Sequence, residues 1–210
     1  MDMPIRILGR DTSINVRKVL WTCHELGTGF VREDYGNGFA STHTATYLNL
    51  NPNGQVPVLI DDTFVLWESN TICRYLASKH AATGLLPAHP RGRAQVEQWM
   101  DWQATELNPA WRYPFMALIR QDPACQDADT LAAGGKEWNR MMGILDTRLT
   151  HTGAFVTGDE FTLADVVLGL SVNRWKMTPI SHADLPAVEA YYQRLQQREG
   201  FTLYGANGMP

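Results

Sequence analysis

The chain has 210 residues, of which 44% are hydrophobic and 19% are charged, and its formal net charge at pH 7 is −4. This composition is typical of a globular protein and excludes a disordered chain, and the absence of a basic excess excludes a surface for nucleic acid or anionic lipid. The start of the chain shows no signal-peptide pattern, and no apolar run approaches the roughly 20 residues of a membrane span. We therefore expect a cytoplasmic protein with one large domain or two small ones.

The cysteines and histidines limit the chemistry further. Cys23, Cys73 and Cys125 are odd in number and far apart, which is typical of reduced thiols. No Cys-x-x-Cys pair is present, which argues against a thioredoxin or glutaredoxin that uses its own dithiol. The six histidines show no spacing that favours a metal site, so we expect no metal.

The first eighty residues alternate strand and helix patterns. Helical spacing of apolar residues and β-branched runs between turn residues predict these elements. They are strands at 4–9 and 30–35, a helix at 15–26, a short helix within 36–50, a hairpin of 58–60 and 64–67, and a helix at 69–80. This order predicts an α/β domain of the thioredoxin-like type at 1–80.

The rest of the chain carries only helical patterns. Residues 81–90 contain a glycine and two prolines and are predicted to be a linker. Residues 91–210 are predicted to form an all-helical domain, with helices at 91–107, 130–150, 162–174 and 185–198. Pro109 and Pro114 are expected to interrupt or bend the helix after Leu107. Thr162 and Asp165 have the spacing of a capping box, which we interpret as a folding element.

One motif indicates a binding site. Pro57 follows Val56 at the start of an otherwise strand-like run, and a cis bond there would turn the Val56 backbone outward as an edge for a peptide. Glu68 and Ser69 then open a helix, so that a carboxylate can hold an amine and the helix start can hold a carboxylate. Together these groups predict a receptor for one end of a small zwitterionic peptide.

The stretch 51–60, followed by 68–76, resembles the N-terminal domain of the cytosolic glutathione S-transferase superfamily, and the resemblance covers essentially the whole chain. It implies a thioredoxin-like domain followed by an all-α domain, with glutathione as co-substrate. It also implies that Val56, Pro57, Glu68 and Ser69 bind glutathione, and that Gln55 meets the glycine carboxylate with a neutral hydrogen bond.

The loop before the first helix has two interpretations. Thr12, Ser13 and Asn15 are all suitable helix caps. The resemblance to serine-type transferases of the theta, zeta and bacterial nu-like kind implies instead that Ser13 is catalytic and donates to the glutathione sulfur. In that interpretation Asn15 shares the role and Thr12 is the alternative donor. The loop contains no tyrosine and no cysteine, which argues against the classes that use those residues.

The resemblance also implies a pocket for the second substrate in the helical domain, formed by Trp111, Arg112, Phe115, Met116 and Trp175. The expected activity is conjugation of the glutathione thiolate to a small electrophile, in a homodimer that serves detoxification. Two alternatives stay open: a glutathione-dependent disulfide or peroxide reductase, and a non-catalytic binding protein with the same fold. The sequence does not identify the second substrate.

Overall fold

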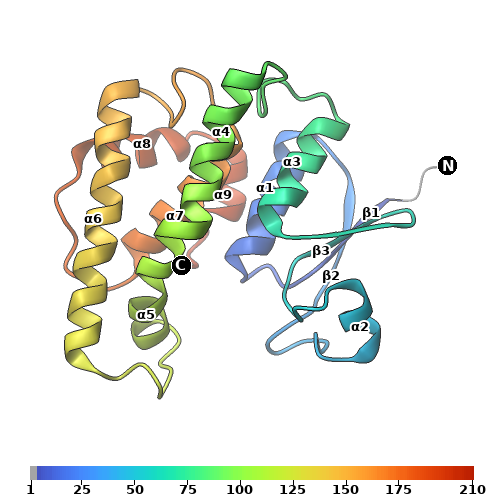
Figure 1. The fold of residues 1–210 in the computed structure, drawn as a ribbon, viewed down its shortest axis with the longest axis horizontal. Helices are drawn as coiled ribbons and strands as arrows, with labels where there is room; N and C mark the ends of the chain where they lie inside the picture. The colour runs from blue at the N-terminus through green and yellow to red at the C-terminus, as the bar shows by residue number, and fades with distance from the viewer. Residues whose placement is uncertain (1–3) are drawn as a thin grey trace. The chain divides into compact units, whose positions relative to one another are not determined.

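The computed structural model describes residues 4–210 and divides the chain into two compact units, one ending at Thr83 and one beginning at Gly84. The first unit, here unit 1, is an α/β structure, and the second, unit 2, is helical (Figure 1). This confirms the predicted combination of a thioredoxin-like domain and an all-α domain. No helix in residues 4–210 combines the length and the apolar content needed to cross a membrane.

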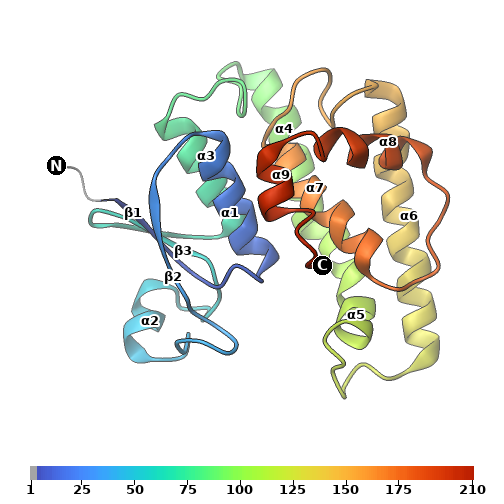
Figure 2. The same cartoon turned by 180° about the vertical axis from the view of Figure 1, so that it is seen from behind.

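Unit 1 is a four-stranded mixed sheet with helices on both faces. Its elements are β1 (Ile5–Leu8), α1 (Ile14–Glu25), β2 (Phe30–Glu33), α2 (Ala45–Leu50), β3 (Val58–Asp61), β4 (Phe64–Trp67) and α3 (Ser69–Lys79). The strand order is β2-β1-β3-β4; β1 and β2 are parallel, and the other two pairs are antiparallel. Helices α1 and α3 lie together on one side of the sheet, and α2 lies on the other (Figures 1 and 2).

The spacing of apolar residues explains these layers. Val16, Val19 and Cys23 are fully buried and recur at helical intervals along α1. On the opposite face of the sheet, Tyr47 of α2 packs against Leu8 and Val58. The two faces of the sheet are therefore closed by different helices, and the first residues of α1 and α3 are left at one edge of the unit.

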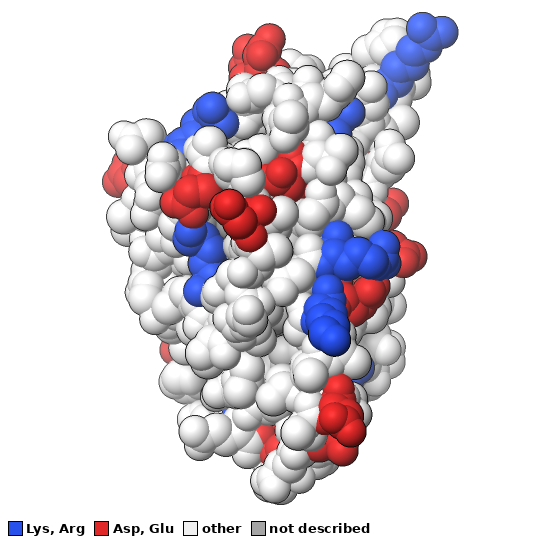
Figure 3. Space-filling view, turned by 90° about the vertical axis from the view of Figure 1, so that its left-hand side faces the viewer, with Lys and Arg blue, Asp and Glu red and all other residues white. Residues whose placement is uncertain are grey.

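Unit 2 consists of helices around a buried central one. Its elements are α4 (Pro90–Trp102), the π-helical turn η1 (Gln103–Leu107), α5 (Asn108–Leu118), α6 (Ala128–Thr152), α7 (Leu163–Met177), α8 (Pro186–Leu195) and α9 (Glu199–Tyr204). Helix α7 lies in the middle of the unit and is buried from Leu163 to Trp175, including its polar residues Asp165, Ser171 and Asn173 (Figure 2). On the face shown in Figure 3, Lys and Arg side chains are interspersed with Asp and Glu side chains.

Of the two predicted effects of Pro109, interruption or bending of the helix, the interruption does not occur. The chain passes from α4 through η1 into α5 without leaving the helical region, because the π turn precedes the proline. The Asn108 amide donates to the Gln103 carbonyl five residues back, and this wider turn accommodates the proline ring. Pro114 also lies inside α5, where it faces Gly134 of α6; a Cβ at Gly134 would come within 3.0 Å of the Pro114 ring. Helix α9 was not predicted, because six residues are too few for a clear period.

The predicted capping box at the start of α7 is confirmed. The Asp165 carboxylate is fully buried and accepts hydrogen bonds from the Thr162 amide at 2.8 Å, the Val156 amide at 2.9 Å and the Tyr191 hydroxyl at 3.0 Å. Burial raises the pKa of Asp165 to about 6, although these donors favour the ionised form. The group thus ties α7, α8 and the loop before α7 together.

The raised pKa makes the stability of the protein depend on pH. Because the folded state holds the Asp165 proton up to about pH 6 and the unfolded chain releases it near pH 4, the contribution of Asp165 is full at low pH and is lost as pH rises through this window. We expect the free energy of unfolding to fall by roughly 2–3 kcal/mol between pH 4 and pH 6, relative to Asp165→Asn. Urea unfolding at several pH values measures this difference. Parallel curves for the two proteins would contradict the assignment.

Candidate functional site

A polar pocket of about 130 Å³ lies in unit 1 at the first residues of α1 and α3, and we call it the α1–α3 pocket. Its lining combines amides, a hydroxyl, a carboxylate and two apolar residues. The lining residues are Asn15, Asn51, Asn53, Gln55, Val56, Pro57, Glu68 and Ser69. The structure therefore brings six sequence-predicted site residues together, from three segments of the chain. Asn51 and Asn53 were not predicted as site residues, although the Asn-Pro-Asn-Gly turn that carries them is visible in the sequence.

The loop before β3 is held rigidly against α2. The Gln55 carbonyl accepts hydrogen bonds from the Tyr47 hydroxyl at 2.8 Å and from the Asn51 side-chain amide at 2.9 Å. The Asn51 Oδ1 atom in turn accepts from the Asn53 amide at 3.0 Å. The Val56-Pro57 peptide bond is cis, as the sequence predicts. These hydrogen bonds fix the position of the backbone segment that carries Gln55 and Val56, which both line the pocket.

Glu68 occupies an unusual position at the start of α3. Its backbone has φ 71° and ψ 107°, a combination that residues other than glycine rarely adopt, so the residue is held in a strained conformation. It is the N-cap of α3, yet its side chain makes no capping hydrogen bond and is exposed. Strain of this kind is concentrated at functional sites, and the carboxylate is left available to a ligand.

Ser69 joins the starts of the two helices. It is buried at the first position of α3, and its hydroxyl donates to the Asn15 side-chain oxygen in α1 over 3.4 Å. The main-chain amides at the start of α3 have no partner within the helix and carry a partial positive charge. This corner of the pocket is therefore suited to a carboxylate.

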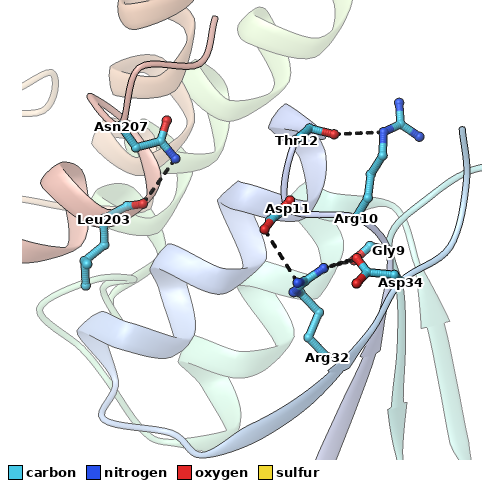
Figure 4. Close-up of polar contacts among 8 residues, drawn as sticks. All are labelled: Gly9, Arg10, Asp11, Thr12, Arg32, Asp34, Leu203 and Asn207. Carbon is cyan, nitrogen blue, oxygen red and sulfur yellow. Dashed lines mark hydrogen bonds and ion pairs between the residues drawn. The ribbon is translucent and has the colours of Figure 1, made fainter. Parts of the chain in front are cut away.

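Ser13, the first catalytic candidate, lies at the N-cap of α1, two residues before Asn15. Its side chain makes no capping hydrogen bond, so its hydroxyl remains available as a donor. Thr12, the alternative donor, accepts a hydrogen bond from the Arg10 side chain at 3.0 Å (Figure 4). Asn15 lines the α1–α3 pocket, but its side-chain oxygen already accepts from Ser69. Ser13 does not line the pocket, but its hydroxyl makes no capping bond. Both residues therefore remain candidates.

An arginine from β2 holds the loop that carries Ser13. Figure 4 shows the Arg32 side chain between Gly9 and Asp11. Its guanidinium donates to the Gly9 carbonyl at 3.2 Å, forms an ion pair with Asp34 and lies 3.5 Å from the Asp11 carboxylate. The sequence did not indicate this role, because Arg32 lies 23 residues after Gly9.

Only glycine fits at position 9. Gly9 has φ +153°, and a Cβ there would lie 2.5 Å from Val16 Cγ2 and 3.1 Å from the Val56 Cβ. The loop therefore passes close to both α1 and the loop before β3 because residue 9 has no side chain.

The aromatic residues predicted for a second pocket are partly clustered in unit 2. The Trp111 and Phe115 rings meet edge to face with their centroids 5.4 Å apart. The Arg174 guanidinium, from α7, lies over both rings, 4.4 Å and 4.1 Å from their centroids. Arg112 is exposed and Met116 is half-buried on the same helix.

Trp175 is separate from this cluster. Its side chain is buried, its indole donates to Asn139 at 3.0 Å, and its ring packs edge to face with His182. It lines a different cavity, together with His182 and Leu185. Arg174, its neighbour in sequence, is the residue that meets Trp111 and Phe115.

Two cysteines are chemically inert. Burial raises the pKa of the Cys23 thiol to about 12 and that of the Cys73 thiol to about 11. The thiolate is the reactive form of cysteine, and neither residue forms it at neutral pH. No cluster of three or more potential metal ligands occurs among residues 4–210.

Two family models match the chain. The model described as "Glutathione S-transferase, N-terminal domain" matches residues 12–79, and that described as "Glutathione S-transferase, C-terminal domain" matches residues 128–194. The first match contains every residue that lines the α1–α3 pocket.

Similar proteins carry the same description over nearly their full length. "Glutathione S-transferase GstB" of Escherichia coli K12 is 36% identical over 92% of this chain and 94% of its own. "Glutathione S-transferase 3" of Zea mays is 33% identical over 94% of this chain and 91% of its own. A theta-class glutathione S-transferase from Xanthomonas axonopodis pv. citri, solved with glutathione bound, superimposes with a TM-score of 0.89 and is 36% identical; the match covers 96% of this chain and 97% of that one.

The strained backbone of Glu68 predicts a stability effect that is separate from binding. Glu68→Gly should raise the free energy of unfolding by about 1 kcal/mol, because relief of 1–3 kcal/mol of strain exceeds the roughly 0.5–1 kcal/mol that glycine costs through the entropy of the unfolded chain. Glu68→Gln keeps the strain and should stay within about 0.5 kcal/mol of the wild type. Denaturant unfolding compares the three proteins. A Glu68→Gly variant less stable than Glu68→Gln would show that the conformation is not strained.

Proposed function

Because the chain belongs to the glutathione S-transferase family, we propose that the α1–α3 pocket binds glutathione and that the protein conjugates the glutathione thiolate to a small electrophile. The observation that carries this proposal is the pocket itself, in which Glu68, Ser69 and the Val56 backbone converge. Each matches one polar part of a γ-glutamyl peptide. The solved relative with glutathione bound supports the same assignment.

The contacts of the peptide follow from charge. Glu68, whose carboxylate makes no capping bond, takes the ammonium group of the γ-glutamyl residue. The start of α3, with the Ser69 hydroxyl, takes the carboxylate of the same residue. The Val56 backbone pairs with the backbone of the cysteinyl residue, as an added strand would. The cysteinyl sulfur is then directed toward the start of α1.

The chemical task is to ionise the thiol. A free thiol has a pKa near 8.5, so only about 3% is thiolate at neutral pH. We assign the stabilising donor to the Ser13 hydroxyl, at the positive end of α1, with Asn15 as the second candidate. The thiolate then attacks the electrophile, and its proton passes to solvent.

The second substrate is proposed to bind at the aromatic residues of α5. The half-buried Trp111 offers apolar surface, and the buried Phe115 and Arg174 side chains pack against its ring and hold it in place. Arg112 and Met116 are proposed to border it. Trp175, hydrogen-bonded to Asn139, contributes by holding the end of α7.

We also propose the organisation that is usual in this family. Residues 1–80 form the glutathione domain, 81–90 the linker and 91–210 the helical domain. The protein is proposed to be a cytoplasmic homodimer that detoxifies electrophiles, with no need of a metal.

Ser13→Ala should raise the pKa of the bound glutathione thiol by about 1–2 units, because it removes one hydrogen bond to a charged acceptor, worth roughly 1.5–3 kcal/mol. Turnover at neutral pH should fall roughly 10–100-fold and recover as pH rises. Ultraviolet titration of the bound thiolate measures the shift directly.

Asn15→Ala is the matched comparison, since both residues are polar and lie at the start of α1. If Asn15→Ala loses the thiolate and Ser13→Ala keeps it, the asparagine holds the sulfur and the assignment to Ser13 is wrong.

A further inference from the structure

A further cavity, of about 420 Å³, lies wholly within unit 2, and we call it the α5–α6 pocket. It is bounded by the end of α5, one side of α6 and the loop that follows α7. Its volume is within the range of roughly 300–1,000 Å³ that is typical of pockets for small molecules. It shares no lining residue with the α1–α3 pocket, and none of its residues has a part in the proposed glutathione reaction.

Asn139 of α6 holds the loop that forms one wall of this pocket. Its side chain donates to the Ser181 carbonyl at 2.8 Å and accepts from the Ala183 amide at 3.2 Å. The same side-chain oxygen accepts from the Trp175 indole at 3.0 Å. These bonds fasten the loop to both α6 and α7, so the wall of the pocket is part of the folded structure.

The inside of the pocket is mainly apolar. Leu118, Leu131 and Ile180 line it and are only half-buried, so part of their hydrocarbon surface is left to solvent. Between them α6 presents Ala132 and Gly135, and a Cβ at Gly135 would meet no atom within 4 Å. The α6 side of the pocket is therefore hollow, and an apolar ligand there would remove the surrounding hydrocarbon from water.

Lys136 is the one charged residue that lines the pocket. Its side chain is exposed, and no hydrogen bond or ion pair of this ammonium is found within residues 4–210. The carboxylate beside it in sequence, Glu137, is bound to the Arg140 guanidinium by hydrogen bonds of 2.7 and 2.8 Å. A single ammonium balances one negative charge, and no arginine lines the pocket to hold a doubly charged phosphate through two parallel bonds.

We propose that the α5–α6 pocket is a binding site for an apolar monocarboxylate of the fatty-acid type. The hydrocarbon part packs on Leu118, Leu131 and Ile180, and the carboxylate pairs with the Lys136 ammonium. This site is additional to the proposed function and does not depend on it.

Calorimetry with octanoate on the full-length protein tests the proposal. Gly135→Leu places a side chain in the cavity and should weaken octanoate binding at least tenfold. Gly143→Leu is the matched control, because Gly143 also lies in α6, a Cβ there also meets no atom within 4 Å, and the residue is outside the pocket lining. This control should bind octanoate as the wild type does.

The charge is tested separately with 1-octanol, the neutral counterpart of octanoate. Lys136→Gln should weaken octanoate binding at least about threefold, as expected for the loss of an exposed ion pair, and should leave 1-octanol binding unchanged. Equal weakening of both compounds would contradict the pairing of the carboxylate with Lys136.

Three other results overturn the proposal. The wild type binds no octanoate at millimolar concentration, or Gly135→Leu binds it as well as Gly143→Leu does, which places the octanoate elsewhere on the protein. In the third, sedimentation shows that Gly135→Leu alone changes the oligomeric state of the ligand-free protein, so that the pocket receives a neighbouring chain.

Discussion

The packing of α1 against α3 is the constraint on which the rest of the site depends. Side-chain hydrogen bonds contribute to it: the buried Lys18 ammonium donates to the Asn70 side chain at 3.2 Å, and the Ser69 hydroxyl donates to Asn15 at 3.4 Å. The strands that precede the two helices, β1 and β4, run in the same direction, so both helices begin at the same end of the strands. Their free amide groups and partial positive charges therefore lie close together. A ligand with two negative groups, a carboxylate and a thiolate, is complementary to such a pair of helix starts.

The helix starts of this protein fall into two kinds. Thr44 accepts from the Tyr47 amide, Asp127 accepts from the Thr130 amide, and Asp165 closes the capping box of α7, so these side chains are used within the fold. Ser13 and Glu68 occupy the N-cap position and make no capping hydrogen bond, as do His89, Leu185 and Arg198 at the starts of α4, α8 and α9. Since serine is one of the residues that cap best and a cap contributes about 1 kcal/mol, the unmade bond at Ser13 is consistent with a hydroxyl that serves a ligand.

This difference also marks how far the sequence could predict the site. The strands, the main helices and the Thr162–Asp165 box depend on local spacing, and they were predicted correctly. Whether Ser13 caps its helix could not be predicted, because the sequence shows a residue that favours the N-cap position but does not show whether its hydroxyl makes the capping bond. Arg32 was missed because its contact with Gly9 spans 23 residues. The uninterrupted passage of the helix at Pro109 could not be predicted, because the π turn that precedes the proline leaves no pattern in the composition.

Amide hydrogen exchange with and without glutathione tests the central claim, that the ligand lies across the starts of α1 and α3 and along Val56. At a glutathione concentration 100 times the dissociation constant, linkage stabilises the folded state by roughly 2.7 kcal/mol. We expect slower exchange in segments 13–18, 51–56 and 68–72, beyond any slowing in the loop at 178–185 of unit 2. Saturating glutathione that leaves these three segments unchanged, or protects only unit 2, would contradict the account.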